Sequence, residues 1–184
     1  MHGHHKYHDD AERRIWQEPE PILKKIGLRP GMTFVDVGCG SGFFALPAAR
    51  MAGKGGLVYG IDVDAEAIEA LRVNAEKEGL DNLRPAAGAA EEAVPCEGCA
   101  DIVFFGICLH DFDDPAKVLL RARRMLKPGG RLVDLDWKKE PTPVGPPLEK
   151  RFDLEKAAGL IRAAGYVVES QADEGLYHYL ILAR

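Results

Sequence analysis

The sequence predicts an α/β fold, a doubly wound sheet that is mostly parallel and ends in an antiparallel C-terminal hairpin. Short apolar runs rich in β-branched residues alternate with helical patterns, which is typical of a parallel sheet covered by helices. The last two apolar runs are separated by only a short polar turn, so they must pair antiparallel, because a parallel return needs a long crossover. A chain of 184 residues, 46% hydrophobic and 29% charged, is long enough to bury one core. We therefore predict a single domain over residues 1–184.

Four short apolar segments are predicted strands of the parallel part of this sheet. They are TFVDV (33–37), LVYGI (57–61), DIVFFG (101–106) and GRLVDLDW (130–137). A further segment, LRPAAG, begins at Leu83 and fits a strand only at a sheet edge or a strand start, because Pro85 has no N–H for a central ladder.

Two of the predicted helices carry clear start and stop signals. The segment DAEAIEALRVNAEKEG begins with Asp64 as an N-cap and ends at Gly79, with apolar residues at helical spacing between them. The segment DPAKVLLRARRMLKPGG repeats this pattern, with Asp114 as the cap and Pro115 at the first helical position. Its Lys-Pro-Gly sequence is expected to end the second helix.

The last third of the chain departs from this alternation. A proline-rich connector leads to a predicted helix over residues 153–164. The strands YVVESQ and LYHYLILAR follow, joined by a polar ADEG turn. The connector contains Pro141, Pro143, Pro146 and Pro147.

Composition and charge exclude several classes of function. The net charge is -5, and the basic residues are scattered, so no nucleic-acid partner is expected. No apolar run approaches the roughly 20 residues needed to cross a bilayer, so we expect no membrane partner and a cytoplasmic location. The cysteines do not form a secreted disulfide framework, and reduced thiols are expected. They are Cys39, Cys96, Cys99 and Cys108.

One cysteine pair has spacing that could serve a metal or redox role. Cys96 and Cys99 lie in PCEGCAD, but the second pair that a structural zinc site needs is missing. We predict no metal site and interpret the pair as two loop thiols or an occasional disulfide.

A glycine-rich loop follows the first predicted strand in VDVGCGSGFF, where Gly38, Gly40 and Gly42 precede a helix. Such a loop brings backbone N–H groups close to a ligand and favours a nucleotide-like molecule. The spacing G-x-G-x-G, with Asp36 two positions earlier, differs from the G-x-G-x-x-G of dinucleotide sites. About twenty residues further, Asp62 ends the next strand, where a carboxylate can accept ribose hydroxyls in a Rossmann-like sheet.

Four segments taken together, LRPGMTFVDVGCGSGFF, GIDVDAEAIE, ADIVFFGICLHDFDDP and LKPGGRLVDLDW, resemble in this order the motifs of class I S-adenosylmethionine-dependent methyltransferases. The resemblance covers residues 22–137, and the terminal hairpin is similar to the reversed last strand of that family. It implies S-adenosylmethionine as the methyl donor and S-adenosylhomocysteine as the product.

The same resemblance implies roles for several residues. Asp36 would face the methionine amino end of the cofactor, the three loop glycines would lie beneath it, and Asp62 would hold the ribose. Val63 would lie beside the adenine, and Gly106 at the end of the fourth strand would be a further cofactor contact.

The adenine position departs from the pattern of the family. Many members have Gly-Asp-Ala before the fourth strand, and the Asp reads the adenine amino group. This sequence has GAAEE, so Ala89 replaces that carboxylate. The backbone N–H near Ala90 or the carboxylate of Glu91 is expected to serve the adenine instead.

The acceptor is expected over the carboxyl ends of the fourth and fifth strands, where in-line displacement needs a nucleophile held near the methyl group. The candidates there are His110, Asp111, Asp136 and Trp137. His110 is the candidate base because its ordinary pKa lies near neutrality, and a structural role is the alternative. Asp111 could instead cap the following helix, and Trp137 could be an apolar lid over the core edge.

The chain begins with a histidine-rich leader, MHGHHKYHDDAERRIW. Since the connector after the fifth strand is too short for a cap domain, we hypothesise that residues 1–18 form a lid over the acceptor site. Such a lid would bring His4, His5, His8 or Trp16 near the acceptor. A tag remnant and a metal site are the alternatives.

The predicted function is methyl transfer to a small-molecule acceptor by a monomer or a homodimer. The alternatives are a protein or RNA methyltransferase, a metalloid methyltransferase of the arsenite type, and a regulator that binds S-adenosylmethionine without turnover.

Overall fold

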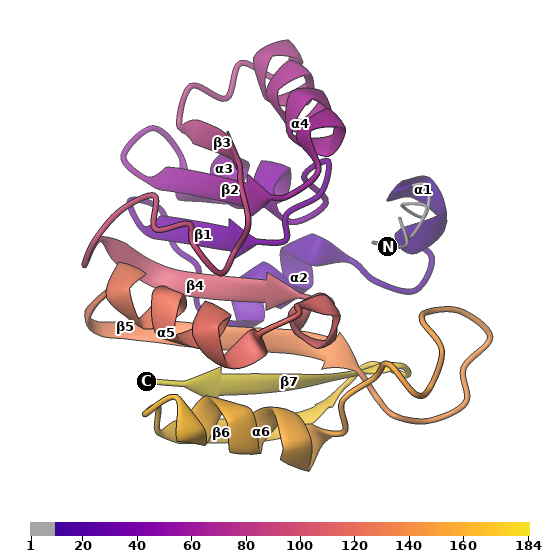
Figure 1. Ribbon diagram of the computed structural model, residues 1–184. Coiled ribbons are helices and arrows are strands. Elements are labelled where there is room, and N and C mark those ends of the chain that lie inside the picture. Colours follow the sequence, from indigo (N-terminus) through magenta and orange to yellow (C-terminus); the bar gives the residue numbers. More distant parts are fainter. Residues whose placement is uncertain (1–9) are drawn as a thin grey trace.

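The computed structural model describes residues 10–184, and a seven-stranded sheet crosses the molecule in the order β3-β2-β1-β4-β5-β7-β6 (Figure 1). The strands are β1 (Thr33–Val37), β2 (Leu57–Asp62), β3 (Leu83–Ala87), β4 (Ala100–Gly106), β5 (Leu126–Trp137), β6 (Val168–Glu174) and β7 (His178–Ala183). The first five are parallel to one another, and β7 is antiparallel to both β5 and β6. The predicted mixed sheet with a terminal hairpin is confirmed.

Helices cover both faces of the sheet (Figure 1). One apolar cluster joins α2 (Pro19–Lys25), α3 (Ala45–Ala52) and α4 (Ala65–Lys77) to one face. A second joins α5 (Pro115–Met125) and α6 (Leu154–Ala163) to the other. The central strands are therefore buried on both sides, which explains why they are apolar throughout rather than alternating.

The predicted N-caps are present. Asp64 accepts hydrogen bonds from the backbone N–H groups of Glu66 and Ala67 at the start of α4. Asp114 accepts one from Lys117 at the start of α5. These side chains satisfy helix N–H groups that have no partner within the helix.

Several boundaries differ from the prediction. Helix α5 ends at Met125, before the Lys-Pro-Gly sequence, because the backbone is already extended at Leu126 and joins β5. In the C-terminal hairpin, Ala172, Asp173 and Glu174 pair with β7, so most of the predicted ADEG turn belongs to β6. The turn lies three residues later, over 175–177, and begins at Gly175, whose positive φ suits a tight reversal.

Two further sequence predictions concern the position of Pro85 and the state of one cysteine pair. Pro85 lies in β3, which is an edge strand as expected. Cys96 and Cys99 form a disulfide, the second of the two interpretations of this pair. The disulfide lies just before β4, at the edge of the sheet where the parallel strands begin.

The opposite edge, where the parallel strands end, is covered by two segments (Figure 1). One is α1 (Asp10–Arg13) with the turn that follows it, and the other is the loop over residues 138–153. The buried side chain of Arg151 holds this loop together from inside. Its guanidinium donates to the carbonyl oxygens of Lys138, Glu140, Val144 and Pro146 and to the hydroxyl of Thr142.

Candidate cofactor and acceptor site

The glycine loop is fixed to the end of β2 by backbone hydrogen bonds. The N–H groups of Gly38 and Cys39 donate to the carbonyl oxygen of Ile61 at 2.8 and 3.0 Å. Gly38 has a positive φ, and a Cβ at this position would lie 2.9 Å from the sulfur of Cys108. A residue without a side chain is therefore required for the segment after β4 to approach β1.

Asp62 ends β2 and turns its carboxylate toward the glycine loop. One oxygen accepts a hydrogen bond from the N–H of Gly40 at 2.7 Å, and the other accepts one from Asp64 at 2.9 Å. Hydrogen bonds therefore join the glycine loop to Asp62, the residue that is predicted to bind the ribose. Gly42 lies beyond this turn and lines a cavity of about 360 Å³ with residues of α3 and α4.

Asp36, on β1, is buried at 1% exposure, and its Oδ2 has no hydrogen-bond partner among the residues that the structure describes. Burial raises the pKa of Asp36 to about 7, and the nearby carboxylate of Asp62 raises it further. The charge of Arg13 and the backbone N–H of Ala45 act in the opposite direction. A buried carboxylate with an open oxygen suits a cationic group such as an ammonium.

The predicted adenine position offers an apolar surface. Val63 is 71% exposed directly after the ribose candidate, which is unusual for a large apolar side chain. Gly88 donates to the carbonyl of Asp62 at 2.8 Å, so the loop after β3 is tied to this corner. Within that loop Ala90 is buried, and the backbone carbonyl of Glu91 accepts a hydrogen bond from Arg121 of α5.

The segment after β4 starts with a strained residue. Ile107 has a φ of +59°, a conformation that β-branched residues rarely adopt, and its N–H donates to Leu135 at 2.6 Å. At Gly106 a Cβ would lie 2.7 Å from the ring of Phe104, so packing also requires glycine there. Cys108 then donates its thiol to the carbonyl of Val37 at 3.0 Å.

His110 and Asp136 form a buried pair between the ends of β4 and β5. The Nδ1 of His110 lies 2.7 and 2.9 Å from the two carboxylate oxygens of Asp136. Both side chains are 1% exposed. The Nε2 of His110 has no hydrogen-bond partner among residues 10–184, although Asp111 lies 3.5 Å away. Asp136 therefore holds the ring by one nitrogen and leaves the other for a ligand.

The pKa of His110 is set by opposing effects. Burial lowers it, but the charge and hydrogen bond of Asp136 and the charge of Asp111 more than compensate, so the pKa is raised. The predicted alternative for Asp111, a helix cap, is wrong, because Asp114 caps α5.

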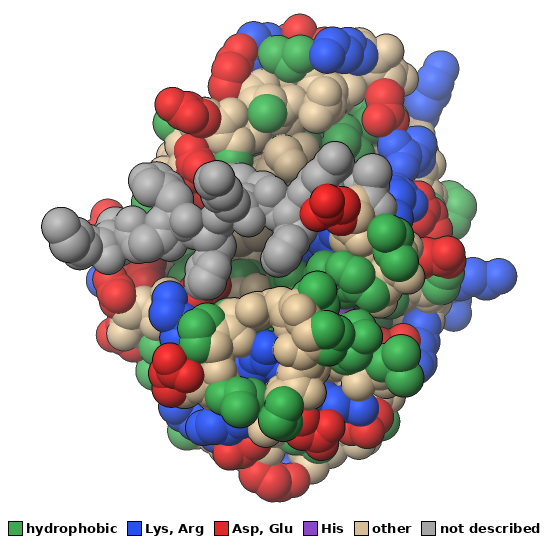
Figure 2. Space-filling model, turned by 90° about the vertical axis from the view of Figure 1, so that its right-hand side faces the viewer, with side chains coloured by type: hydrophobic (Ala, Val, Ile, Leu, Met, Phe, Trp, Pro, Cys, Tyr) green, Lys and Arg blue, Asp and Glu red, His purple; other side chains and the backbone are tan. Residues whose placement is uncertain are grey.

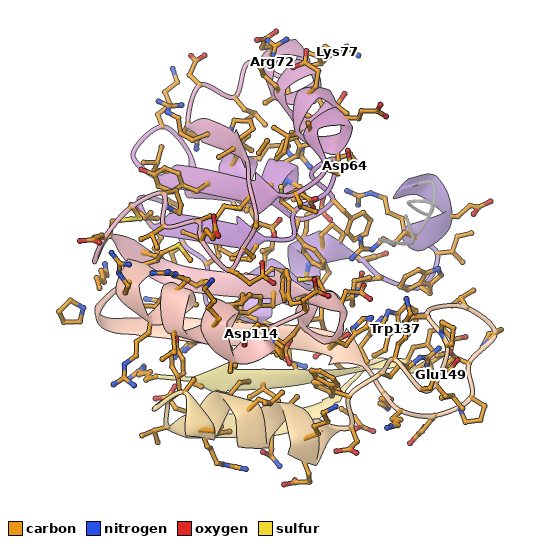
Figure 3. The ribbon with its side chains drawn as sticks, viewed as in Figure 1. Asp64, Arg72, Lys77, Asp114, Trp137 and Glu149 are labelled. Carbon is orange, nitrogen blue, oxygen red and sulfur yellow. A yellow bond between two sulfur atoms is a disulfide. The ribbon has the colours of Figure 1, made fainter. Side chains whose placement is uncertain are left out.

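Trp137 is buried within an aromatic cluster, which we define as Trp16, Trp137, Tyr177 and His178. The rings of Trp137 and His178 are 4.4 Å apart, and Trp16 lies 5.2 Å from Trp137 and 5.6 Å from His178. Burial lowers the pKa of His178 to about 3, so its ring is neutral. Figure 3 shows Trp137 at the end of β5, beside the loop that carries Glu149. Trp16 thus lies beside Trp137 at the end of β5, and the lid over the acceptor stays a prediction.

Two further polar residues at this edge were not found by sequence reasoning. Arg13 donates from Nε to the Oε1 of Gln17 at 2.8 Å, and Gln17 is 3% exposed. No motif marks them, because they precede the four segments that resemble the family motifs and approach the site only through the fold. His4, His5 and His8 lie outside the described residues.

The thiols do not converge on this site. The disulfide of Cys96 and Cys99 is at the opposite edge of the sheet, and burial raises the pKa of the Cys108 thiol well above its ordinary value. Within the part of the chain that the structure describes, no group of three His, Cys, Asp or Glu side chains could hold a metal ion.

The model of a family described as a methyltransferase domain matches residues 28–167, more than half of the chain. The chain belongs to the class I S-adenosylmethionine-dependent methyltransferases. S-adenosylmethionine is therefore its cofactor. A methyltransferase from Aquifex aeolicus, described as dependent on this cofactor, superimposes with a TM-score of 0.89 at 30% identity, covering 96% of this chain and 98% of that one.

The names of two curated relatives describe methyl transfer to different atoms, oxygen in one and carbon in the other. A nocamycin O-methyltransferase from Saccharothrix syringae is 34% identical, covering 84% of this chain and 51% of that protein. A ubiquinone/menaquinone biosynthesis C-methyltransferase from Vibrio vulnificus is 32% identical, covering 84% of this chain and 57% of that protein. This chain spans about half the length of the curated relatives it matches.

Proposed function

We propose that this protein transfers the methyl group of S-adenosylmethionine to a small-molecule acceptor that must lose a proton, with His110 as the base. The observation that carries the proposal is the buried pair of His110 and Asp136, in which the Nε2 of His110 has no hydrogen-bond partner among residues 10–184. It lies at the edge where the parallel strands end, which is where ligands bind in open α/β sheets.

The residues present fit the cofactor. Asp36 offers a buried, open carboxylate oxygen to the ammonium of the methionine end, and the Asp62 carboxylate is already oriented toward the glycine loop. The exposed Val63 offers an apolar surface to the adenine, with the loop that carries Ala90 and Glu91 beside it. When bound, the cofactor supplies an electrophilic methyl group on a sulfonium, whose departure leaves a neutral thioether.

His110 would then act as a general base on the acceptor. Asp136 keeps a proton on Nδ1, so Nε2 carries the lone pair that accepts a proton from an O–H or an acidic C–H of the acceptor. The oxygen or carbon atom forms its bond to the methyl group as that proton leaves. The resulting imidazolium is stabilised between the carboxylates of Asp136 and Asp111.

The acceptor side of the site favours an apolar, planar molecule. Figure 2 looks onto the edge where the parallel strands end and shows hydrophobic side chains gathered on this face. The aromatic cluster lies at this edge, and aromatic rings prefer to stack on other flat rings. The two curated relatives, an O- and a C-methyltransferase, have names consistent with small acceptors that lose a proton. The expected cytoplasmic location and the monomer or homodimer remain predictions.

The test is turnover of a labelled methyl donor with a panel of phenols, enolisable diketones, amines and thiols. We expect phenols or diketones to be methylated, and His110→Asn to lower kcat by about 10²- to 10⁴-fold, the usual contribution of a general base. The affinity for S-adenosylhomocysteine should not change, since His110 is not assigned to the cofactor. Turnover by the natural chain should rise as the pH rises through the raised pKa of His110, because the base must be neutral.

Two variants sharpen this result. Asp136→Asn removes the charge that raises the pKa of His110, so the rise in turnover should move to lower pH. Asp113→Asn, an exposed change in the same loop, is the matched control and should leave kcat unaltered. Equal turnover by His110→Asn and the natural chain on every methylated acceptor would rule out the base.

A further inference from the structure

Arg13 links two buried polar side chains on one side of the proposed cofactor site, because it hydrogen-bonds Gln17 and its charge acts on Asp36. The Oδ2 of Asp36 and the Nε2 of Gln17 are buried, and neither atom has a hydrogen-bond partner among the described residues. Arg13 is tied to Gln17 through its Nε. Buried polar atoms without partners are uncommon in native proteins and indicate a missing ligand or water.

The guanidinium of Arg13 is placed over the glycine loop. Its central carbon lies 3.9 Å from the ring centre of Phe43 and 5.3 Å from that of Phe44. Phe43 directly follows Gly42, so the cation lies beside the turn that is expected to approach the cofactor. Its charge also lowers the pKa of Asp36, on the neighbouring strand β1.

We propose that Arg13 and Gln17 bind the α-carboxylate of the cofactor's methionine end, opposite Asp36, which binds the ammonium. An α-amino acid needs one anionic acceptor and a set of donors, and these three side chains provide both. Arg suits this role because its planar guanidinium matches a carboxylate with two parallel hydrogen bonds. The inference rests on the donor site of the proposed function and assigns residues that none of the recognised motifs contains.

This assignment links the cofactor to the acceptor edge. Trp16 lies between Arg13 and Gln17 in the chain and contacts Trp137 and His178. A cofactor carboxylate bound by Arg13 and Gln17 therefore also fixes the ring of Trp16, which covers the end of β5. The cofactor should bind before the acceptor, because it completes the wall against which the acceptor lies.

The test uses calorimetry with two ligands that differ in one group: S-adenosylhomocysteine and its analogue without the α-carboxylate. The natural chain should bind S-adenosylhomocysteine about 10- to 100-fold more tightly, the range expected for charge-assisted hydrogen bonds. Arg13→Ala should abolish most of that preference, and Gln17→Ala should reduce it. The affinity of both variants for the analogue should stay near that of the natural chain.

The neighbouring Arg14→Ala is the matched control, because Arg14 hydrogen-bonds Glu20 and its guanidinium lies 5.7 Å from the ring centre of Phe43, further away than that of Arg13. It should keep the full preference for the carboxylate. Gln17→Glu provides a second variant if Arg13→Ala does not fold, and its negative charge should weaken S-adenosylhomocysteine binding while leaving the analogue less affected.

Three outcomes would overturn the inference. An unchanged preference in Arg13→Ala would show that the carboxylate is bound elsewhere, and the proposed function would stand. An equal loss of affinity for both ligands would show a merely structural role for Arg13. A natural chain that binds neither ligand would remove the donor site itself, and with it the proposed function as well.

Discussion

At the scale of single residues, the site contains ionisable groups whose burial favours ligand binding over stability. Asp36 is the clearest case, because its pKa of about 7 means that the folded protein resists ionising it. A group with a raised folded pKa holds a proton in the folded state that the unfolded state has already lost. The fold therefore loses stability as the pH rises from the ordinary pKa of the carboxyl to the raised one.

We predict that Asp36→Asn removes this pH dependence. From pH 5 to pH 7, the natural chain should lose about 2–3 kcal/mol of unfolding free energy relative to Asp36→Asn, because each unit of pKa shift is worth about 1.4 kcal/mol. Above pH 7 the difference should level off. Urea unfolding at a series of pH values measures it, and a pH-independent difference would contradict the raised pKa.

The same variant should lose affinity for S-adenosylhomocysteine, since the ammonium would lose its carboxylate. For the natural chain, that affinity should fall as the pH falls below 7, where Asp36 becomes protonated. Calorimetry over the same pH series tests this, and Asp36→Asn should show a flatter profile.

Residue identities at the site were partly predictable from the sequence. Asp36 and Asp62 follow from the spacing of the glycine loop, and His110 and Asp136 follow from their place at the carboxyl ends of the fourth and fifth strands. The contact between His110 and Asp136 was not predicted, because it depends on β4 and β5 being neighbours in register. Gln17 was not found at all, since nothing in the local sequence distinguishes it from a surface glutamine.

At the scale of elements, the strands and capped helices followed the sequence most closely. The spacing of their apolar residues and their capping residues are local signals, and local signals are sufficient to predict an element where they agree with burial. The loop over residues 138–153 had no such signal beyond its prolines. Its shape depends on Arg151, whose five hydrogen bonds run to carbonyl groups and a hydroxyl spread along the whole loop.

We predict that Arg151→Met loosens this loop. The change leaves several backbone carbonyls without their donor and should lower the unfolding free energy by about 2–4 kcal/mol. The KM for the acceptor should rise, and the affinity for S-adenosylhomocysteine should change little, because the loop borders the end of β5 rather than the glycine loop. Lys139→Met, an exposed change in the same loop, is the control and should alter neither quantity.

At the scale of the whole molecule, one sheet separates two apolar clusters. Phe104 and Phe105 are adjacent in β4 and fully buried, but they face opposite sides of the sheet. Phe104 packs against Phe44, the residue before α3, and Phe105 packs on the side of α5 and α6. Each cluster depends on the same central strand.

We predict that the two clusters unfold together. Phe104→Ala and Phe105→Ala should each cost about 3–5 kcal/mol of unfolding free energy, the usual loss for a buried Phe. Both variants should keep a single transition, with fluorescence and circular dichroism changing at the same denaturant concentration. Separate transitions in either variant would refute the prediction of one domain.

The loop that Arg151 organises also bears on how such a protein could change its acceptor. The N–H of Lys138 donates to the carbonyl of Tyr177 in the turn between β6 and β7, and Arg151 donates to the carbonyls of Lys138 and Leu148. The glycine loop, Asp62 and the pair of His110 and Asp136 make none of those contacts. New loop sequences could therefore be exchanged between Lys138 and Arg151, provided that the arginine and the carbonyl groups around it are kept. Selectivity for the acceptor could diversify in this way while the donor chemistry stayed the same.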